Sequence, residues 1–592
     1  MKALILRLCV AFVAVAASVA CGDDDQGTSP VLEGTGITSP SWNDDNPAEA
    51  KDGILMFSFS AAGEWTASSD ADWCGVLTAS GGAGECSLRL RLSANTSDTP
   101  RTAVLTIQLT GYHTPAVFRV TQAEGYSQQG DGRYKEVNEW MYDYMESHYL
   151  WNEPLPSLPL DYSLDYQRFL TSLLDAVAAQ GDVNHEDGVW QGGKRKYYYT
   201  FVQSGAPVGA SSLAVGQPVN GTGVFLMQPT RLPGGVVGLA IQAVTPGSPA
   251  AEAGLKRGDF ISHVNGTTLT SNNYEQLGLL VYNGPARVTP NDMIWNGNDY
   301  RMYPREEVSL GAGRYTDPAI YKHDVLSLDN GRKVGYLVYM GFHCDYDREL
   351  LEIFDQFAAA GISDLILDLR YNNGGDVLAA DVLATLIAGR NYKGLVFANF
   401  VYNAERMAAG EKGDLRIGEK VCASAPGGYQ PIEDALDHAL GMRTVYVICS
   451  PTTASASEML VNGLRGLDIE VRMVGMTTNG KNVGMEGISR KFYSYDFNFY
   501  PVTFYTENAK GFRDYSDGLT PDVVIDDSGY FPGDFGTVDD TYSGAALSWI
   551  LTGQKPSVSD RSLRSVAPLG DLASERLARR AGGCVVHPVK RP

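Results

Sequence analysis

The chain has 592 residues, more than a single hydrophobic core ordinarily supports, so its length predicts several domains. Hydrophobic residues make up 44% and charged residues 20% of the chain, which is ordinary for globular protein. The formal net charge of −22 argues against nucleic acid as a partner, because binding phosphates requires clustered Lys and Arg.

Residues 1–20 have the pattern of a signal peptide. Lys2 and Arg7 form a basic region, and the apolar run that follows is too short to span a bilayer. The sequence Ser18-Val19-Ala20-Cys21 resembles a bacterial lipobox, which implies lipidation of Cys21 and a membrane anchor. Ordinary cleavage nearby, with Cys21 left as a thiol, is the alternative.

Residues 21–50 are expected to form a lipidated linker, because their Gly, Ser, Pro, Asp and Asn content is typical of a flexible tether. The acidic run Asp23-Asp24-Asp25 resembles the surface-export signal of some Gram-negative lipoproteins. No later segment is long and apolar enough to span a membrane. We therefore expect an outer membrane lipoprotein, on the periplasmic face or at the cell surface.

Residues 51–125 alternate apolar and polar side chains in short runs between Gly and Asn turns, which predicts a small all-β module. The module resembles the BACON domain, which implies an immunoglobulin-like β-sandwich. The resemblance is carried by Trp65, Asp72-Trp73, Ser80-Gly81, Asn95, Arg101 and Val120-Thr121-Gln122. It implies either glycan contact or a spacer role. We favour the spacer, with Trp65 and Trp73 in the core.

The eight cysteines include two, Cys74 and Cys86, that lie close in sequence within this module and could pair in an oxidising compartment. Cys344 and Cys449 stand in apolar strand-like runs, which favours buried thiols outside any disulfide. No Cys or His spacing is typical of a zinc site, so we expect no metal and no cofactor.

Residues 133–205 are expected to form a helical segment. Apolar side chains recur at helical spacing on one face, at Val137, Trp140, Met141, Tyr144 and Met145. A second amphipathic run covers Tyr166–Val177.

Residues 220–290 resemble a PDZ domain. The resemblance is carried by Gly221-Thr222-Gly223-Val224, by Gly247-Ser248-Pro249-Ala250, by the run from Ala253 to Asp259 and by Val264-Asn265-Gly266. It implies that a peptide binds as an added strand, with its carboxylate held by the amides of Gly221, Thr222, Gly223 and Val224. An unrelated glycine-rich β fold is the alternative.

Residues 325–530 alternate apolar strands with helical stretches, which predicts an α/β core. The strands are expected at Val334–Val338, Leu365–Leu369, Val445–Cys449 and Val471–Val474. The tail at 555–592 lacks such periodicity, and residues 560–592 hold seven Lys and Arg against three Asp and Glu. We expect this tail to be disordered or loosely attached.

Ser455 is the first candidate for chemistry, because it stands between an apolar strand and a helix-like run. An oxyanion formed beside it would meet the unpaired first amides of the helix, including that of Ala456. By itself, such a Ser and Ala run is usually only a helix cap. Three further segments strengthen the case, namely Asp368–Gly375, Gly475–Lys481 and Gly518–Val523.

Together these motifs resemble the C-terminal processing peptidases, also called tail-specific proteases. The signatures D-L-R-x-N-x-G-G, S-A-S-E, G-x-x-T-x-G-K and G-x-x-P-D occur in that order behind the PDZ-like region. The resemblance covers residues 133–530. It implies a multidomain serine endopeptidase acting on protein or peptide substrates, whose ClpP/crotonase-like α/β core carries an inserted PDZ domain that recognises substrate C-terminal tails.

Residue by residue, the resemblance implies Ser455 as nucleophile, Lys481 as general base and Glu458 as a supporting acidic residue. It also implies an oxyanion hole made by the amides of Gly374, Gly375 and Ala456. A lysine base must be neutral, which burial favours, so Lys481 should be largely buried.

Two departures from related enzymes stand out. Relatives often carry a Gln four residues after the lysine, where this chain has Met485. Tricorn-type relatives use an upstream His, but the nearest match here is Tyr197-Tyr198-Tyr199-Thr200, and His185 stands in a loop-like run. His343 is expected to be structural or exposed rather than catalytic.

Two alternatives to a peptidase are open. One is a catalytically inactive cell-surface lipoprotein that binds peptides or carbohydrate. The other is a β-lactamase-like acyl transferase, although the Ser-x-x-Lys spacing of that class is absent around Ser455.

Overall fold

The computed structural model describes residues 34–38, 53–93, 95, 100–122, 132–180, 187–191, 194–204, 218–295, 300–418, 422–423, 430–431, 434–492, 495–526, 531–557, 567–568 and 585–586. The expected signal peptide, Cys21, most of the linker, His185 and most of the tail lie outside these residues. Two compact units divide the chain, Met1–Gln128 and Gln129–Pro592. In the described part, no helix has the length and apolarity needed to cross a membrane.

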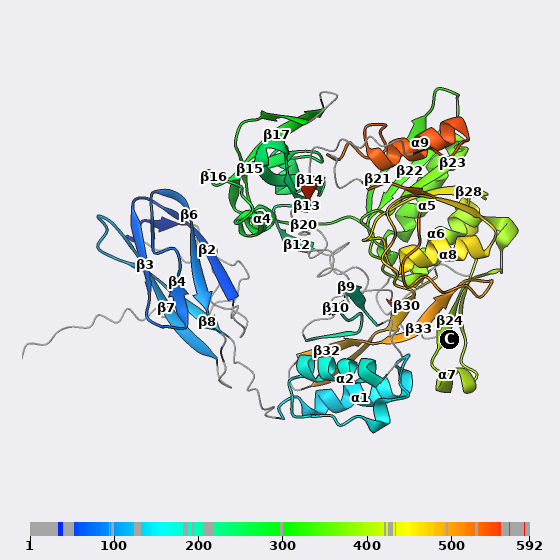
Figure 1. Ribbon diagram of the computed structural model, residues 1–592, viewed down its shortest axis with the longest axis horizontal. Helices are drawn as coiled ribbons and strands as arrows, with labels where there is room; N and C mark the ends of the chain where they lie inside the picture. Colours follow the sequence, from blue (N-terminus) through cyan, green and yellow to red (C-terminus); the bar gives the residue numbers. More distant parts are fainter. Residues whose placement is uncertain are drawn as a thin grey trace, which may run out of the picture. The chain divides into compact units, whose positions relative to one another are not determined.

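The N-terminal unit is built from two four-stranded antiparallel sheets (Figure 1). One sheet has the order β1 (Ile37–Thr38), β2 (Gly53–Ala61), β6 (Gly84–Leu92) and β4 (Cys74–Val76). The other has the order β5 (Ser80–Gly81), β3 (Trp65–Ser69), β7 (Arg101–Leu109) and β8 (Ala116–Gln122). Alternate residues of β7 and β8 are buried, as the sequence pattern predicts. The strand-rich module is confirmed, and its immunoglobulin-like character stays a prediction.

Trp65 and Trp73 of this unit pack inward. Trp65 is buried and meets Phe59 edge to face, with ring centroids 5.0 Å apart. Trp73 is partly buried against the same core, and the guanidinium of Arg101 lies 4.4 Å from the centre of its ring. Trp65 is therefore a core residue, as expected.

Cys74 and Cys86 do not form a disulfide. Cys74 lies opposite Leu92 in the β4–β6 pair, whereas Cys86 stands six residues earlier on β6. At about 3.4 Å per residue this separation is far beyond the reach of a disulfide. The expected pairing is wrong, and Cys86 Sγ instead accepts a hydrogen bond from Trp65 Nε1 at 3.1 Å.

The second unit begins with two helices, α1 (Lys135–His148) and α2 (Tyr166–Gln180), as the apolar spacing predicts. They share a core with strands from much later in the chain, in the sheet of order β11 (Phe201–Ser204), β32 (Tyr495–Tyr500) and β31 (Ile488–Phe492). The last part of the expected helical segment forms short strands instead, β9 (Val189–Gln191), β10 (Lys194–Tyr197) and β11. Its run of aromatic and β-branched residues suits a strand better than a helix.

The PDZ-like region forms one antiparallel sheet (Figure 1). Its main order is β18 (Tyr300–Pro304), β17 (Ala286–Trp295), β15 (Phe260–Val264), β14 (Val237–Val244), β13 (Val224–Arg231) and β35 (Ala567–Pro568). Strand β16 (Thr267–Thr268) pairs with β15, and β19 (Val308–Leu310) pairs with β17. Helix α4 (Tyr274–Asn283) packs against β13 and β14, and the short α3 (Pro249–Glu252) follows β14.

The α/β core is confirmed. A six-stranded sheet has the order β21 (Ile320–Ser327), β22 (Lys333–Tyr339), β23 (Asp364–Asp368), β28 (Thr444–Cys449), β29 (Glu470–Gly475) and β34 (Val523–Val524). All pairs except β21–β22 are parallel. β23 is buried along its whole length, as a parallel strand covered on both faces should be. The more specific ClpP/crotonase-like likeness stays a prediction.

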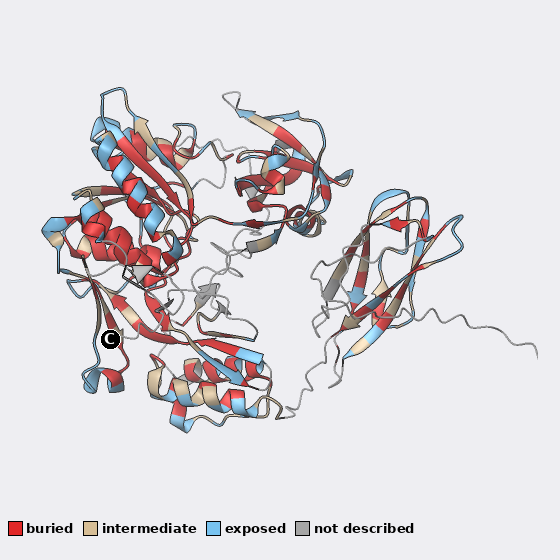
Figure 2. Ribbon diagram, turned by 180° about the vertical axis from the view of Figure 1, so that it is seen from behind, coloured by how far each residue is buried: buried red, intermediate tan, exposed pale blue. Residues whose placement is uncertain are grey.

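Helices cover both faces of this sheet (Figures 1 and 2). Helix α9 (Thr541–Thr552) packs on β28 and β29, while α6 (Val377–Ala388) and α8 (Ala456–Gly466) pack together on the other side. Helix α5 (Asp347–Ala360) packs on α6 and β21. Helix α8 also contacts a second sheet, of order β25 (Gly413–Arg416), β24 (Val396–Tyr402), β33 (Val502–Glu507), β30 (Val483–Glu486) and β36 (Val585–Val586). This position buries α8 almost completely.

Candidate active site

Three parallel strands of the core sheet end side by side, and each is followed by one of the sequence motifs. β23 leads into the loop that carries Gly374, β28 leads to Ser455, and β29 leads to Lys481. The carboxyl ends of parallel strands share one edge of the sheet, where binding sites of α/β proteins form. The topology therefore brings together motifs that are far apart in the sequence.

Ser455 occupies a strained backbone position at the start of α8. Its φ is 60° and its ψ is −117°, which non-glycine residues rarely adopt. It is only 2% exposed. A sharp strand-to-helix turn of this kind is how α/β hydrolases present a nucleophile.

Two glycines are required where the β23 loop passes this turn. A Cβ on Gly374 would lie 2.7 Å from the Ser455 Cβ and 3.0 Å from the Ala456 amide nitrogen. A Cβ on Gly375 would lie 2.1 Å from the Phe342 carbonyl oxygen. Both glycines also have positive φ, 105° and 136°. The loop therefore approaches the serine as closely as backbone atoms permit.

The Gly374 amide is engaged within its own loop. It donates to Oδ1 of the buried Asn372 at 2.9 Å. The Ala456 amide stands at the first position of α8, ahead of the internal hydrogen bonds of the helix. The oxyanion hole of Gly374, Gly375 and Ala456 stays a prediction, and it requires Asn372 to release the Gly374 amide. The sequence motif contains Asn372 but gave it no role.

The carboxylate of Glu458 joins the serine turn to the lysine loop. It is fully buried and accepts four hydrogen bonds. Oε1 accepts from Thr478 Oγ1 at 2.5 Å and from the Gly480 amide at 2.7 Å. Oε2 accepts from the amides of Ser455 and Lys481, each at 2.9 Å. Burial raises the pKa of Glu458 to about 7, against the opposing effect of these donors.

Lys481 is buried, as its predicted role requires. Lys481 is 5% exposed, and its Nζ lies 4.6 Å from the centre of the Tyr199 ring. The Tyr199 hydroxyl donates to Asn479 Oδ1 at 2.9 Å, and its amide donates to the buried Asp187 at 2.9 Å. The ring is thus held from two sides over the lysine.

Tyr199 is a site residue that sequence reasoning missed. The sequence identifies Tyr197–Thr200 only as the segment that lacks a histidine where tricorn-type relatives have one. The structure places an aromatic ring from that segment against Lys481. The segment's alignment with the tricorn-type motif was the available signal.

Met485 and His343 have structural environments. Met485 is fully buried in β30, within the core shared by α1, α2 and the β32 sheet, so it packs as an apolar residue. His343 is nearly buried, and its Nδ1 accepts a hydrogen bond from the Asp345 amide at 3.2 Å. It thereby caps the short turn at Cys344–Tyr346, which confirms the expected structural role.

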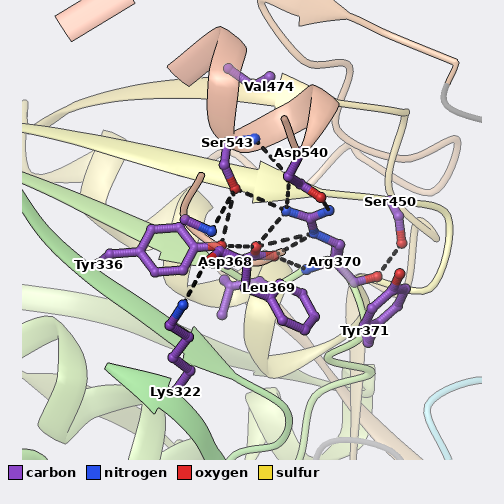
Figure 3. A network of polar contacts seen from close by, with 12 residues as sticks. Lys322, Tyr336, Asp368, Leu369, Arg370, Tyr371, Ser450, Val474, Asp540 and Ser543 are labelled. Carbon is purple, nitrogen blue, oxygen red and sulfur yellow. Dashed lines mark hydrogen bonds and ion pairs between the residues drawn. The ribbon is translucent and has the colours of Figure 1, made fainter. Parts of the chain in front are cut away.

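A buried ionic network joins the end of β23 to the start of α9 (Figure 3). The guanidinium of Arg370 is 1% exposed and contacts Asp368 at 2.6 Å and Asp540 at 2.7 Å. Asp368 also accepts a hydrogen bond from the Tyr336 hydroxyl at 2.6 Å. Burial alone would raise the pKa of Asp540, but Arg370 and then Arg257 outweigh it and hold this pKa well below its usual value.

This network links the PDZ-like region to the serine turn. Arg257, between β14 and β15, reaches Asp540 at 2.9 Å and the Tyr371 hydroxyl at 3.0 Å. The carbonyl oxygen of Arg370 accepts hydrogen bonds from the hydroxyls of Ser450 and Thr452. The loop before Ser455 is therefore held by the same arginine that binds the two carboxylates.

The expected peptide-binding loop of the PDZ-like region is partly occupied by internal contacts. The Thr222 amide donates to the Tyr282 carbonyl at 3.0 Å, and the Val224 amide donates to Thr222 Oγ1 at 3.2 Å. The Tyr282 hydroxyl also accepts from the Met227 amide on β13 at 2.9 Å. Carboxylate binding by Gly221, Thr222, Gly223 and Val224 stays a prediction.

Four family sequence models match the chain. Peptidase family S41 matches residues 333–525, and the peptidase S41 N-terminal domain matches residues 136–186. The PDZ domain matches residues 241–289, and the viral BACON domain matches residues 37–123.

Two curated relatives of the chain are named carboxyl-terminal-processing peptidases or proteases. The chloroplastic carboxyl-terminal-processing peptidase 2 of Arabidopsis thaliana is 30% identical over 26% of this chain and 30% of its own length. A carboxyl-terminal-processing protease of Picosynechococcus is 26% identical over 40% of this chain and 49% of its own. The chain thus spans half or less of these curated relatives.

A crystal structure of a Bacteroides fragilis protein assigned to the S41 proteases covers 70% of this chain and 97% of its own, with 24% identity and a TM-score of 0.56. This likeness shows the fold.

The burial of Glu458 predicts that the free energy of unfolding falls as the pH rises. Its pKa is about 7 in the folded chain and about 4.5 when unfolded, so the folded state loses stability as the pH rises between these values. Glu458→Gln mimics the neutral acid, so it should destabilise the protein less at pH 8 than at pH 5, by about 2 to 3 kcal/mol. Urea unfolding at both pH values measures the difference. Glu405→Gln, at an exposed site on α7 (Ala404–Ala408), should show no such change. Equal effects of Glu458→Gln at both pH values would contradict the prediction.

Proposed function

We propose, from its matches to the models of peptidase family S41 and from the geometry around Ser455, that the chain is a serine endopeptidase that cleaves protein substrates. Ser455 is the proposed nucleophile and Lys481 the proposed general base. The observation that carries the proposal is the convergence of both residues' amides on one buried oxygen of Glu458. Glu458 thereby holds nucleophile and base in one rigid frame.

The proposed reaction is acyl transfer followed by hydrolysis. A serine hydroxyl attacks poorly until a base takes its proton, and a lysine can act only when neutral. Lys481 accepts the proton of Ser455 as its Oγ attacks the peptide carbonyl, and the resulting ammonium protonates the leaving amine. Water activated by the neutral lysine then releases the acyl group and restores Ser455.

Two features would stabilise the charged species that form during this reaction. The Tyr199 ring presents its face to Nζ, where its quadrupole favours the ammonium formed after proton transfer. The helix start at Ala456 and the glycine pair at Gly374 and Gly375 offer amides to the oxyanion. No cofactor enters the proposed reaction.

The PDZ-like region is proposed to recognise a substrate tail by adding it as a strand to β13. The family match at residues 241–289 and the strand already added there, β35, support this role. The BACON-like unit is proposed as a spacer, supported by the burial of Trp65, with glycan contact as the second candidate.

Ser455→Ala should abolish labelling by a fluorophosphonate probe and lower kcat/KM on an unfolded protein substrate by at least about a thousandfold. Lys481→Met should lower the rate similarly, because the hydroxyl then keeps its proton. Ser548→Ala, at an exposed site on α9, is the matched control and should behave as wild type. If folded wild-type protein is neither labelled nor active, the alternative of an inactive binding lipoprotein replaces the proposal.

Tyr199→Leu should lower kcat/KM by roughly 2- to 30-fold, the rate equivalent of a lost cation–π contact of about 0.5–2 kcal/mol. Tyr199→Phe keeps the ring face and loses only the hydrogen bond to Asn479, so its loss should be smaller. Steady-state kinetics on the two variants measure the difference. Identical kinetics for Leu and Phe would remove the ring from the mechanism.

Lipidation of Cys21 and location at the outer membrane, on the periplasmic face or at the cell surface, are also proposed. They rest on the sequence around Cys21 alone. Cells fed a labelled fatty acid should incorporate it into wild-type protein and not into Cys21→Ser. Label retained in the variant would place the anchor elsewhere.

A further inference from the structure

Two short segments of the C-terminal tail form strand pairs with the peptidase unit. β35 pairs antiparallel with β13, with Thr230 opposite Pro568 and Arg231 opposite Ala567. β36 pairs parallel with β30, with Met485 opposite Val585 and Glu486 opposite Val586. The lack of a periodic pattern in the tail predicts neither contact. The two strand pairs therefore raise the question of which ligand each sheet edge binds.

The first edge belongs to the PDZ-like sheet. β14 covers one side of β13, and β35 occupies the other. PDZ domains bind extended peptides by adding them as a strand to a sheet edge. Nearer the start of β13, the Met227 amide is taken by the Tyr282 hydroxyl and Pro229 has no amide hydrogen. The tail therefore pairs with the end of β13 that lies beyond these two positions.

The second edge lies beside the proposed catalytic residues. β30 begins two residues after Lys481, and β33 covers its other side. β36 also packs against α6, which begins two residues after Gly375. The tail strand thus contacts the two elements that begin two residues after Lys481 and two residues after Gly375.

One polypeptide can occupy both edges at once. β35 and β36 are paired with the two edges in the same molecule. The tail also has the opposite charge balance to the chain, with seven Lys and Arg against three Asp and Glu in residues 560–592. Opposite net charge favours its association with the acidic remainder.

We propose that the tail strands β35 and β36 act as intramolecular ligands of the peptidase unit, occupying the β13 and β30 edges as an added substrate strand would. Because they are tethered, they act at high effective concentration and compete with other polypeptides for both edges. Their effect on turnover rests on the proposed function. Their binding to the edges does not, so the two can be tested apart.

The binding test uses the full-length chain carrying Ser455→Ala, which keeps any peptide intact. Val585→Pro together with Val586→Pro removes the two amide hydrogens of β36. A fluorescent peptide of residues 580–592 should bind this chain at least about tenfold more tightly than the chain with an intact tail. Val585→Ala with Val586→Ala keeps both amides and should give a smaller gain. Equal binding by all three chains, or no binding to any, would overturn the proposal.

The second test measures turnover with Ser455 present. The proline variant should raise kcat/KM on a peptide substrate at least about tenfold, and hydrogen exchange along β30 should become faster. Unchanged activity and unchanged exchange would overturn the proposal. If every chain is inactive while the peptide still binds preferentially to the proline variant, the tail proposal stands and the proposed peptidase function fails.

Discussion

The geometry of the candidate site depends on the ion pairs that the buried guanidinium of Arg370 makes. A lone charge at such depth would cost several kcal/mol, and two carboxylates, Asp368 and Asp540, offset that cost by binding it directly. Asp368 ends strand β23, and Asp540 caps helix α9, so one cation joins the sheet to its covering helix. Removing one partner would leave an uncompensated charge, at a cost of about 3–5 kcal/mol. Because the Arg370 carbonyl also accepts a hydrogen bond from Thr452, these ion pairs position the loop before Ser455.

Glu458 applies the same principle nearer to the chemistry. Its four donors satisfy a buried carboxylate, and three of them are backbone amides of the two loops that must meet. Backbone strain at Ser455, with φ at 60°, costs of order 1–3 kcal/mol and persists only where the surroundings hold it. The Glu458 contacts and the close approach of Gly374 are those surroundings. Strain, burial and hydrogen bonding therefore act on one turn.

Local motifs revealed the parts of the site that local chemistry determines. The strands ending at Asp368, Cys449 and Gly475 follow from apolar runs, and parallel pairing brings the motifs after them to one edge. The ring of Tyr199 over Lys481 and the capture of the Gly374 amide by Asn372 depend on side-chain orientations that no spacing encodes. The strands of the tail are two residues long, too short for any periodicity to show. The Cys74–Cys86 pairing failed for the converse reason, because closeness in sequence ignored the register of β6.

The brevity of the tail strands suits competition rather than permanent closure. A two-residue pair makes few backbone hydrogen bonds, each worth about 1 kcal/mol net, so tethering must supply most of its occupancy. A substrate that pairs over more of the β30 edge would make more of these bonds and could displace the tail despite its lower concentration. The PDZ-like region is also joined to the serine turn through Arg257 and the buried ionic network. The domain on which the tail and a substrate are proposed to compete is therefore connected to the residues that support Ser455. The proposed recognition edge and the proposed catalytic site are thus both connected to Arg257.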